Sequence, residues 1–72
     1  MTQQDRQKNA LSILKDAGSI EFDEWAGRLA SQCQLDPATA RQAIRDLVKG
    51  NPYITTLVKK KKILYVHLEM LM

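Results

Sequence analysis

A proline at position 52 separates two parts of this chain that have different hydrophobic patterns. Before it, apolar residues recur every three to four positions, which is the period of a buried helical face. After it, residues 53–58 and 63–68 are rich in β-branched and aromatic side chains, a composition typical of strands. Proline cannot continue a helix, so Asn51-Pro52 also ends the last helical segment. The order of elements predicts an α+β fold, mainly α, in which helices precede a C-terminal β-hairpin.

Two helical segments are predicted in the first half of the chain. The first covers about residues 3–17, and its first two turns, Gln3 to Asn9, are entirely polar, so they either fray in water or lie along something polar. The second covers about residues 23–33, with Asp23 as its N-cap. Its apolar stripe contains Trp25, which we interpret as a core residue rather than as a stacking platform for bases.

A third helix is predicted over about residues 37–49. Asp36 is a favourable N-cap, and Pro37 is a favourable first helical residue because it lacks the amide hydrogen that this position leaves unpaired. Residues 31–34, which precede Leu35, predict a turn longer than the usual glycine-containing turn between two helices.

A hairpin over about residues 53–68 is predicted to follow the third helix. Pairing Val58 with Ile63 places apolar side chains on both faces of this hairpin. Four consecutive lysines, residues 59–62, separate the two strands. Because this run contains neither glycine nor asparagine, it argues against a tight two-residue turn and favours a four-residue loop.

The length and the residue types exclude several classes of protein. Residues 1–72 are enough for one domain. The chain has a single cysteine, Cys33, so it cannot form an internal disulfide. It also has a single histidine, His67, which leaves too few ligands for a metal site. We expect Cys33 in the core and His67 at the surface or in an interface. With no Gly-rich phosphate loop and no carboxylate pair backed by a base, we expect no catalytic residue, no metal and no cofactor, and therefore no enzyme.

The sequence also indicates the cellular compartment in which we expect the protein. No apolar stretch reaches the roughly 18 to 20 residues that span a bilayer. The polar start of the chain is not a signal peptide, and a domain this small without disulfides fits a reducing compartment. We therefore expect a cytoplasmic protein with no membrane partner.

The net charge of +3 is unevenly distributed. Residues 1–36 carry four basic and six acidic side chains, whereas residues 37–72 carry seven basic and two acidic ones. An anionic partner would therefore meet the C-terminal half. At about 100° per residue, one face of the third helix is apolar and the opposite face gathers polar or small side chains. That opposite face contains Ala38, Arg41, Gln42, Arg45 and Lys49.

Such a face fits a helix that lies in the major groove of DNA. Arginine can pair bidentately with guanine and glutamine with adenine. Thr39 borders the face and could donate to a phosphate. The same residue types also occur on ordinary solvated helices, and Asp46 could neutralise part of the charge of Arg45.

The lysine run allows two interpretations. Lys59, Lys60, Lys61 and Lys62 repel one another, and this cost falls when phosphates neutralise them and counterions are released. Lysines there would hold the DNA backbone and contribute little sequence information. Alternatively, they protect an exposed hairpin edge against aggregation.

The stretch from Ile20 to Tyr65 resembles the winged helix-turn-helix DNA-binding superfamily, of the small transcription-regulator type. The matching pattern is Phe22-Asp-Glu-Trp-Ala26, Leu29-Ala30, Leu35-Asp36-Pro37-Ala-Thr39 and Ile44-Arg-Asp-Leu47, followed by the hairpin. The resemblance implies that the third helix contacts the major groove, that the hairpin, or wing, contacts the backbone or minor groove, and that a short strand forms near Ser19-Ile20-Glu21. These roles fall on Thr39, Arg41, Gln42 and Arg45, and on Lys59, Lys60, Lys61 and Lys62.

These observations predict a protein that binds double-stranded DNA, as a small transcriptional regulator or a replication accessory factor, through those residues and Lys49. A first alternative is protein–protein assembly, because the hairpin is apolar on both faces and the tail, residues 69–72, is apolar too. A homodimer could then form through the outer hairpin face or this tail. A second alternative is RNA or ribosome binding, because Ala40-Arg-Gln-Ala-Ile44 before a basic hairpin also resembles a winged-helix ribosomal protein.

Overall fold

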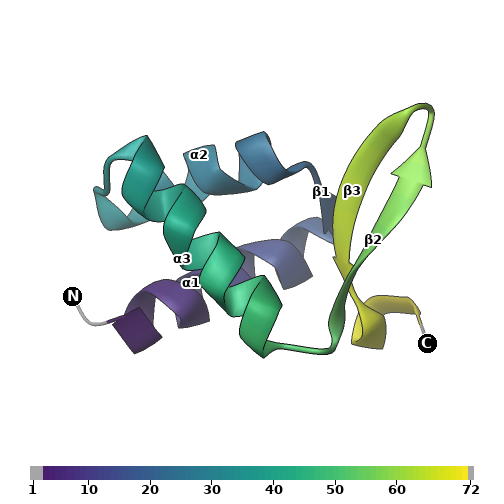
Figure 1. The fold of residues 1–72 in the computed structure, drawn as a ribbon, viewed down its shortest axis with the longest axis horizontal. Coiled ribbons are helices and arrows are strands. Elements are labelled where there is room, and N and C mark those ends of the chain that lie inside the picture. The colour runs from purple at the N-terminus through teal and green to yellow at the C-terminus, as the bar shows by residue number, and fades with distance from the viewer. Residues whose placement is uncertain (1–2, 72) are drawn as a thin grey trace.

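The computed structural model describes residues 3–71, which form three α-helices and a three-stranded antiparallel sheet (Figure 1). The predicted class, α+β and mainly α, is confirmed. The elements in chain order are α1 (Gln3–Ala17), β1 (Ser19–Ile20), α2 (Phe22–Cys33), α3 (Pro37–Gly50), β2 (Ile54–Lys59), β3 (Lys62–His67) and a 3-10 turn, η1 (Leu68–Leu71).

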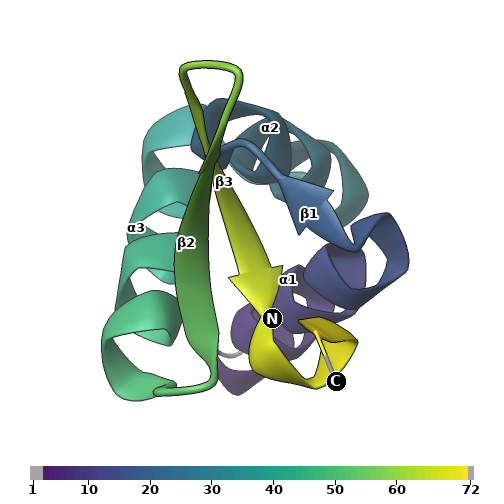
Figure 2. The ribbon, with the colours of Figure 1, turned by 90° about the vertical axis from the view of Figure 1, so that its right-hand side faces the viewer.

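The sheet has the strand order β1-β3-β2 and lies against one end of the helices (Figures 1 and 2). The short strand β1 pairs with β3, with Ile20 opposite Tyr65. In the hairpin, Val58 pairs with Ile63 as predicted, and the same register continues to Ile54 opposite His67. The tip of the hairpin extends past the helices (Figure 2).

The hairpin turn is tighter than the sequence indicates. Lys59 pairs with Lys62, so only Lys60 and Lys61 form the turn, and the predicted four-residue loop is wrong. Both residues have positive φ angles, 52° and 65°. This is the backbone pattern of a type I′ turn, whose twist matches that of the two strands. Two lysines therefore occupy positions that glycine and asparagine usually take, at a cost of about 1–2 kcal/mol each.

Helix α2 begins one residue before the predicted start and ends at the predicted Cys33. It begins at Phe22, and its N-cap is Glu21 rather than Asp23, with no side-chain capping bond. At the other end it continues through Cys33, so the connection to α3 is only residues 34–36, and the predicted long turn is wrong. The helix closes because Gln34 takes the left-handed conformation, with φ 55° and ψ 48°, and its N–H donates to the Ala30 carbonyl.

The left-handed Gln34 gives a first prediction. Gln34→Gly should raise the free energy of unfolding by about 0.5–1 kcal/mol, because glycine takes this conformation without the penalty of a Cβ atom. Urea unfolding followed by circular dichroism measures the change. The matched control is Ser31→Gly, an exposed position inside α2, which should destabilise by about 0.5–1 kcal/mol. Destabilisation by both substitutions would contradict the conformation assigned to Gln34.

The core lies between the three helices and the sheet, with Trp25 at its centre. Trp25 is completely buried, and its Nε1 donates to the Ala10 carbonyl oxygen over 2.8 Å, so the predicted core role is confirmed. Its ring lies 5.7 Å from the Tyr65 ring, which joins α2 to β3. The largest fully buried side chains are Trp25, Leu14, Ile20, Leu29 and Ile44.

The residues with reactive side chains belong to this packing. Cys33 is half-buried and packs against the core, as expected. His67 is buried rather than at the surface, because the chain turns back at η1. The His67 Nδ1 accepts from the Glu69 N–H over 3.2 Å, and the His67 ring stacks on the Tyr53 ring. Across residues 3–71, no helix is long and apolar enough to cross a membrane.

Candidate nucleic-acid interface

Helix α3 presents the face that its sequence predicts. It begins after Asp36, whose carboxylate accepts from the N–H and the hydroxyl of Thr39. These hydrogen bonds lower the pKa of Asp36. The apolar side of the helix is buried, and this side consists of Ala40, Ala43, Ile44 and Leu47. The opposite side is exposed, and it consists of Ala38, Arg41, Gln42, Arg45 and Lys49.

The exposed side of α3 and the hairpin meet at the start of α2. Three basic side chains contact three consecutive residues there: the Arg41 Nη2 lies 3.9 Å from the Asp23 Oδ1, the Arg45 Cζ lies 5.7 Å from the centre of the Phe22 ring, and the Lys62 Nζ lies 3.4 Å from the Glu21 Oε1. The two basic elements therefore border one another on the same side of the molecule. We call Arg41, Arg45 and Lys62 the basic triad.

The Phe22 ring lies between the Arg45 guanidinium and the Tyr65 ring. Phe22 is half-buried, with the Arg45 guanidinium over its ring and the Tyr65 ring 6.0 Å away. Between the start of α2 and the tip of the hairpin lies a shallow hollow of about 390 Å³, lined by residues 21–23 and 61–63. Phe22 was named from the sequence only as part of the pattern Phe22-Asp-Glu-Trp-Ala26, because its contacts come from elements distant in the chain.

Two acidic side chains reduce the positive charge of the triad. Glu21 and Asp23 are 42% and 84% exposed, and their pairs with Lys62 and Arg41 are open to water. Exposed ion pairs of this kind contribute about 0–1 kcal/mol. Such pairs are weak enough for a phosphate to compete for the same cations.

Two predicted contact residues are engaged within α3 itself. The Thr39 hydroxyl donates to Asp36, so its hydrogen serves the helix cap rather than a phosphate. The Gln42 amide donates to the Asp46 Oδ1 over 3.0 Å. A base contact by Gln42 would require this bond to open, whereas the Arg45 guanidinium lies over the Phe22 ring.

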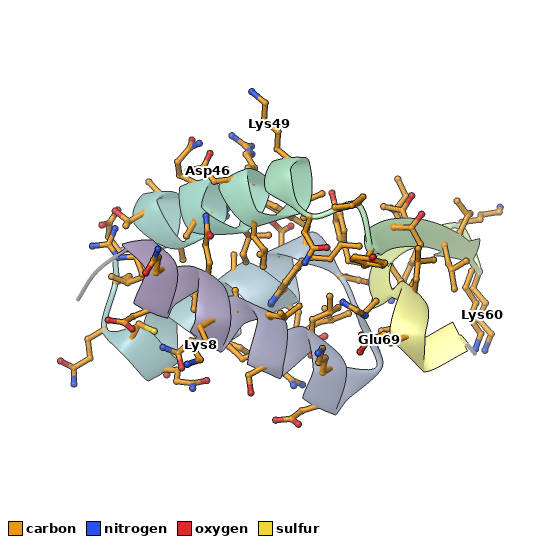
Figure 3. The ribbon with its side chains drawn as sticks, turned by 90° about the horizontal axis from the view of Figure 1, so that it is seen from below. Lys8, Asp46, Lys49, Lys60 and Glu69 are labelled. Carbon is orange, nitrogen blue, oxygen red and sulfur yellow. The ribbon has the colours of Figure 1, made fainter. Side chains whose placement is uncertain are left out.

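The structure does not gather all predicted lysines at one place. Figure 3 shows Lys49 at the C-terminal end of α3 and Lys60 at the tip of the hairpin, and their side chains point in different directions. All four hairpin lysines are exposed. Among the described residues, Lys59, Lys60 and Lys61 form no ion pair.

Comparisons of the chain with models of protein families, with curated proteins and with solved structures found no match. The class that the architecture defines is a small α+β domain with three helices and a three-stranded antiparallel sheet over residues 3–71.

Proposed function

We propose that this protein binds double-stranded DNA as a winged helix domain, with α3 in the major groove and the hairpin on the phosphate backbone. One observation carries the proposal: the basic triad joins the exposed face of α3 to the hairpin through three consecutive residues. A helix exterior flanked by a basic hairpin is the surface that a groove and its backbone require. A role in transcription or in replication is consistent with such a surface.

The arrangement of the elements supports this proposal. Three helices are followed by a hairpin, and β1 adds to the sheet beside β3. The three-residue connection between α2 and α3 has the length of a helix-turn-helix turn. Helix α3 crosses in front of α1 in Figure 1. Its polar face is exposed to solvent.

The roles of the side chains follow from their surroundings. Arg41 and Arg45 can reach base edges or phosphates by releasing exposed contacts with Asp23 and Phe22. The hairpin lysines, residues 59–62, are suited to phosphates because ammonium groups bind them as point charges. Such contacts position the protein along the duplex but do not select a sequence.

The test is fluorescence anisotropy with a labelled duplex at several salt concentrations. We expect binding that weakens as salt rises, and a loss of about 1–3 kcal/mol on a preferred sequence for Arg45→Ala if this residue contacts a base. The control is Arg28→Ala, which removes an exposed arginine of α2 that pairs with Glu24. No duplex binding at low salt, or equal losses for both variants, would contradict the proposal. Single-stranded DNA and RNA of the same sequence serve as competitors.

A second candidate function, assembly with another protein chain, is favoured by a different observation. The exposed large hydrophobic side chains described all lie in or next to the hairpin, and they are Tyr53, Leu57, Val58, Ile63 and Leu68. Val58 is 76% exposed and Ile63 is 61% exposed, and they face one another across the strands. Light scattering after size exclusion distinguishes the candidates: a stable dimer that does not bind duplex DNA would favour assembly.

A further inference from the structure

A second hollow lies on the other flank of α3, between this helix and α1. It has a volume of about 420 Å³ and is open to solvent. Its lining consists of Arg6 from α1 and of Ala38, Thr39, Gln42, Ala43 and Asp46 from α3. At about 100° per residue, these α3 residues lie on the side of the exposed face that is away from Arg41. The hollow therefore borders the proposed DNA surface opposite the hairpin.

Arg6 carries the one polar side-chain atom of the described residues that is buried without a hydrogen-bond partner, its Nε. Buried donors in proteins are almost always satisfied. Leaving one unpaired costs about 1–3 kcal/mol, and more for a charged group. The Arg6 side chain lines an open hollow, and a small shift that exposed its Nε would let phosphate oxygens accept from two of its N–H groups at once.

We propose that Arg6 binds a backbone phosphate of the duplex, on the flank of α3 opposite the hairpin. This inference rests on the proposed DNA binding. A helix in the major groove, which is about 12 Å wide, is bordered by both phosphate strands. The hairpin lysines hold one flank, and Arg6 holds the other, so α1 takes part in binding.

Asp46 sets the limits of this site. Its carboxylate lines the same hollow and accepts from the Gln42 amide. The negative charge of Asp46 opposes a phosphate, so anion binding at this hollow depends on Arg6. Removing this charge with Asp46→Asn should tighten duplex binding, which is the direction opposite to the effect expected for removal of Arg6.

The test compares Arg6→Gln with Lys8→Gln in the duplex-binding assay. Lys8 is exposed on the same helix, and Figure 3 shows it on the side of α1 away from α3. For Arg6→Gln, the slope of log K against log salt should fall by about 0.9, equally on every duplex sequence. For Lys8→Gln the slope should not change. Arg6→Lys, which keeps the charge, should retain most of the slope.

The outcomes separate the two proposals. If the wild-type protein binds duplex DNA and Arg6→Gln matches Lys8→Gln, the role of Arg6 is overturned and the proposed function stands. If the wild-type protein does not bind duplex DNA, both are overturned. A second measurement is made on the wild-type protein and does not depend on a variant. The Nε–Hε NMR signal of Arg6 should shift on addition of the duplex. An Arg6 signal that does not move would overturn the inference even if Arg6→Gln fails to fold.

Discussion

Trp25→Ala is expected to lower the free energy of unfolding by about 3–5 kcal/mol, the largest effect of any single substitution in this domain. The substitution removes a completely buried indole, its hydrogen bond to the Ala10 carbonyl and its contact with Tyr65. A domain of 72 residues has a total stability of roughly 4–11 kcal/mol at about 0.05–0.15 kcal/mol per residue. The variant should therefore be marginally stable or unfolded at room temperature.

Urea unfolding followed by circular dichroism measures this loss without relying on tryptophan fluorescence. Trp25→Phe keeps an aromatic ring and should lose less than Trp25→Ala. The control is Val58→Ala, at a position that is 76% exposed, which should change stability by at most about 0.5 kcal/mol. Equal unfolding midpoints for Trp25→Ala and Val58→Ala would show that Trp25 does not anchor the core.

Removing the charge of the hairpin tip is expected to have the largest effect on DNA binding. The variant K59T/K60N/K61G/K62T removes four lysines but keeps the hairpin, because Asn-Gly is favoured in a type I′ turn and threonine is favoured in strands. If all four lysines contact phosphates, the slope of log K against log salt should fall by about 3 to 4. The measurement is anisotropy with one duplex over a range of salt concentrations.

A control with a similar net charge separates local contacts from a general charge effect. The hairpin variant changes the formal charge from +3 to −1, and K8A/K15A/R28A changes it from +3 to 0 by removing cations that lie away from the hairpin tip. The control should lower the slope far less than the hairpin variant. A hairpin variant with the wild-type slope would remove the hairpin from the proposed interface.

Much of the fold could be predicted from local sequence signals. Asp36-Pro37 and Asn51-Pro52 set the limits of α3 to within one residue, because capping and proline geometry are properties of the adjacent backbone. The register of the hairpin followed from pairing Val58 with Ile63, since one such pair fixes every other pair along two regular strands. The buried and exposed faces of α3 also followed from its period alone.

Two of the errors, the turn before α3 and the hairpin loop, lie where residues take uncommon conformations. Gln34, Lys60 and Lys61 all have positive φ angles, which their residue types do not indicate. In each case the rest of the fold imposes the conformation: a short connection to α3, or the twist of two paired strands. Sequence patterns that look for glycine or asparagine at such positions miss them.

The candidate site was predictable only in part, for a related reason. Arg41, Arg45 and the hairpin lysines were identified by residue type and helical period. The contacts of Phe22 and the unpaired Nε of Arg6 depend on how α1, α2 and the sheet pack, which no local pattern contains. The polar first turns of α1 were the only sequence sign that bears on Arg6, and they left open whether this segment frays in water or lies along something polar.

The position of the Phe22 ring has a consequence for how the two basic elements act. The Phe22 ring lies beside Tyr65 of β3 and under the guanidinium of Arg45 in α3, so it is a shared partner of the sheet and of α3. Groups that share a partner in this way do not contribute additively to a free energy. We therefore expect substitutions in the sheet and in α3 that change the contacts of Phe22 to have non-additive effects on DNA binding.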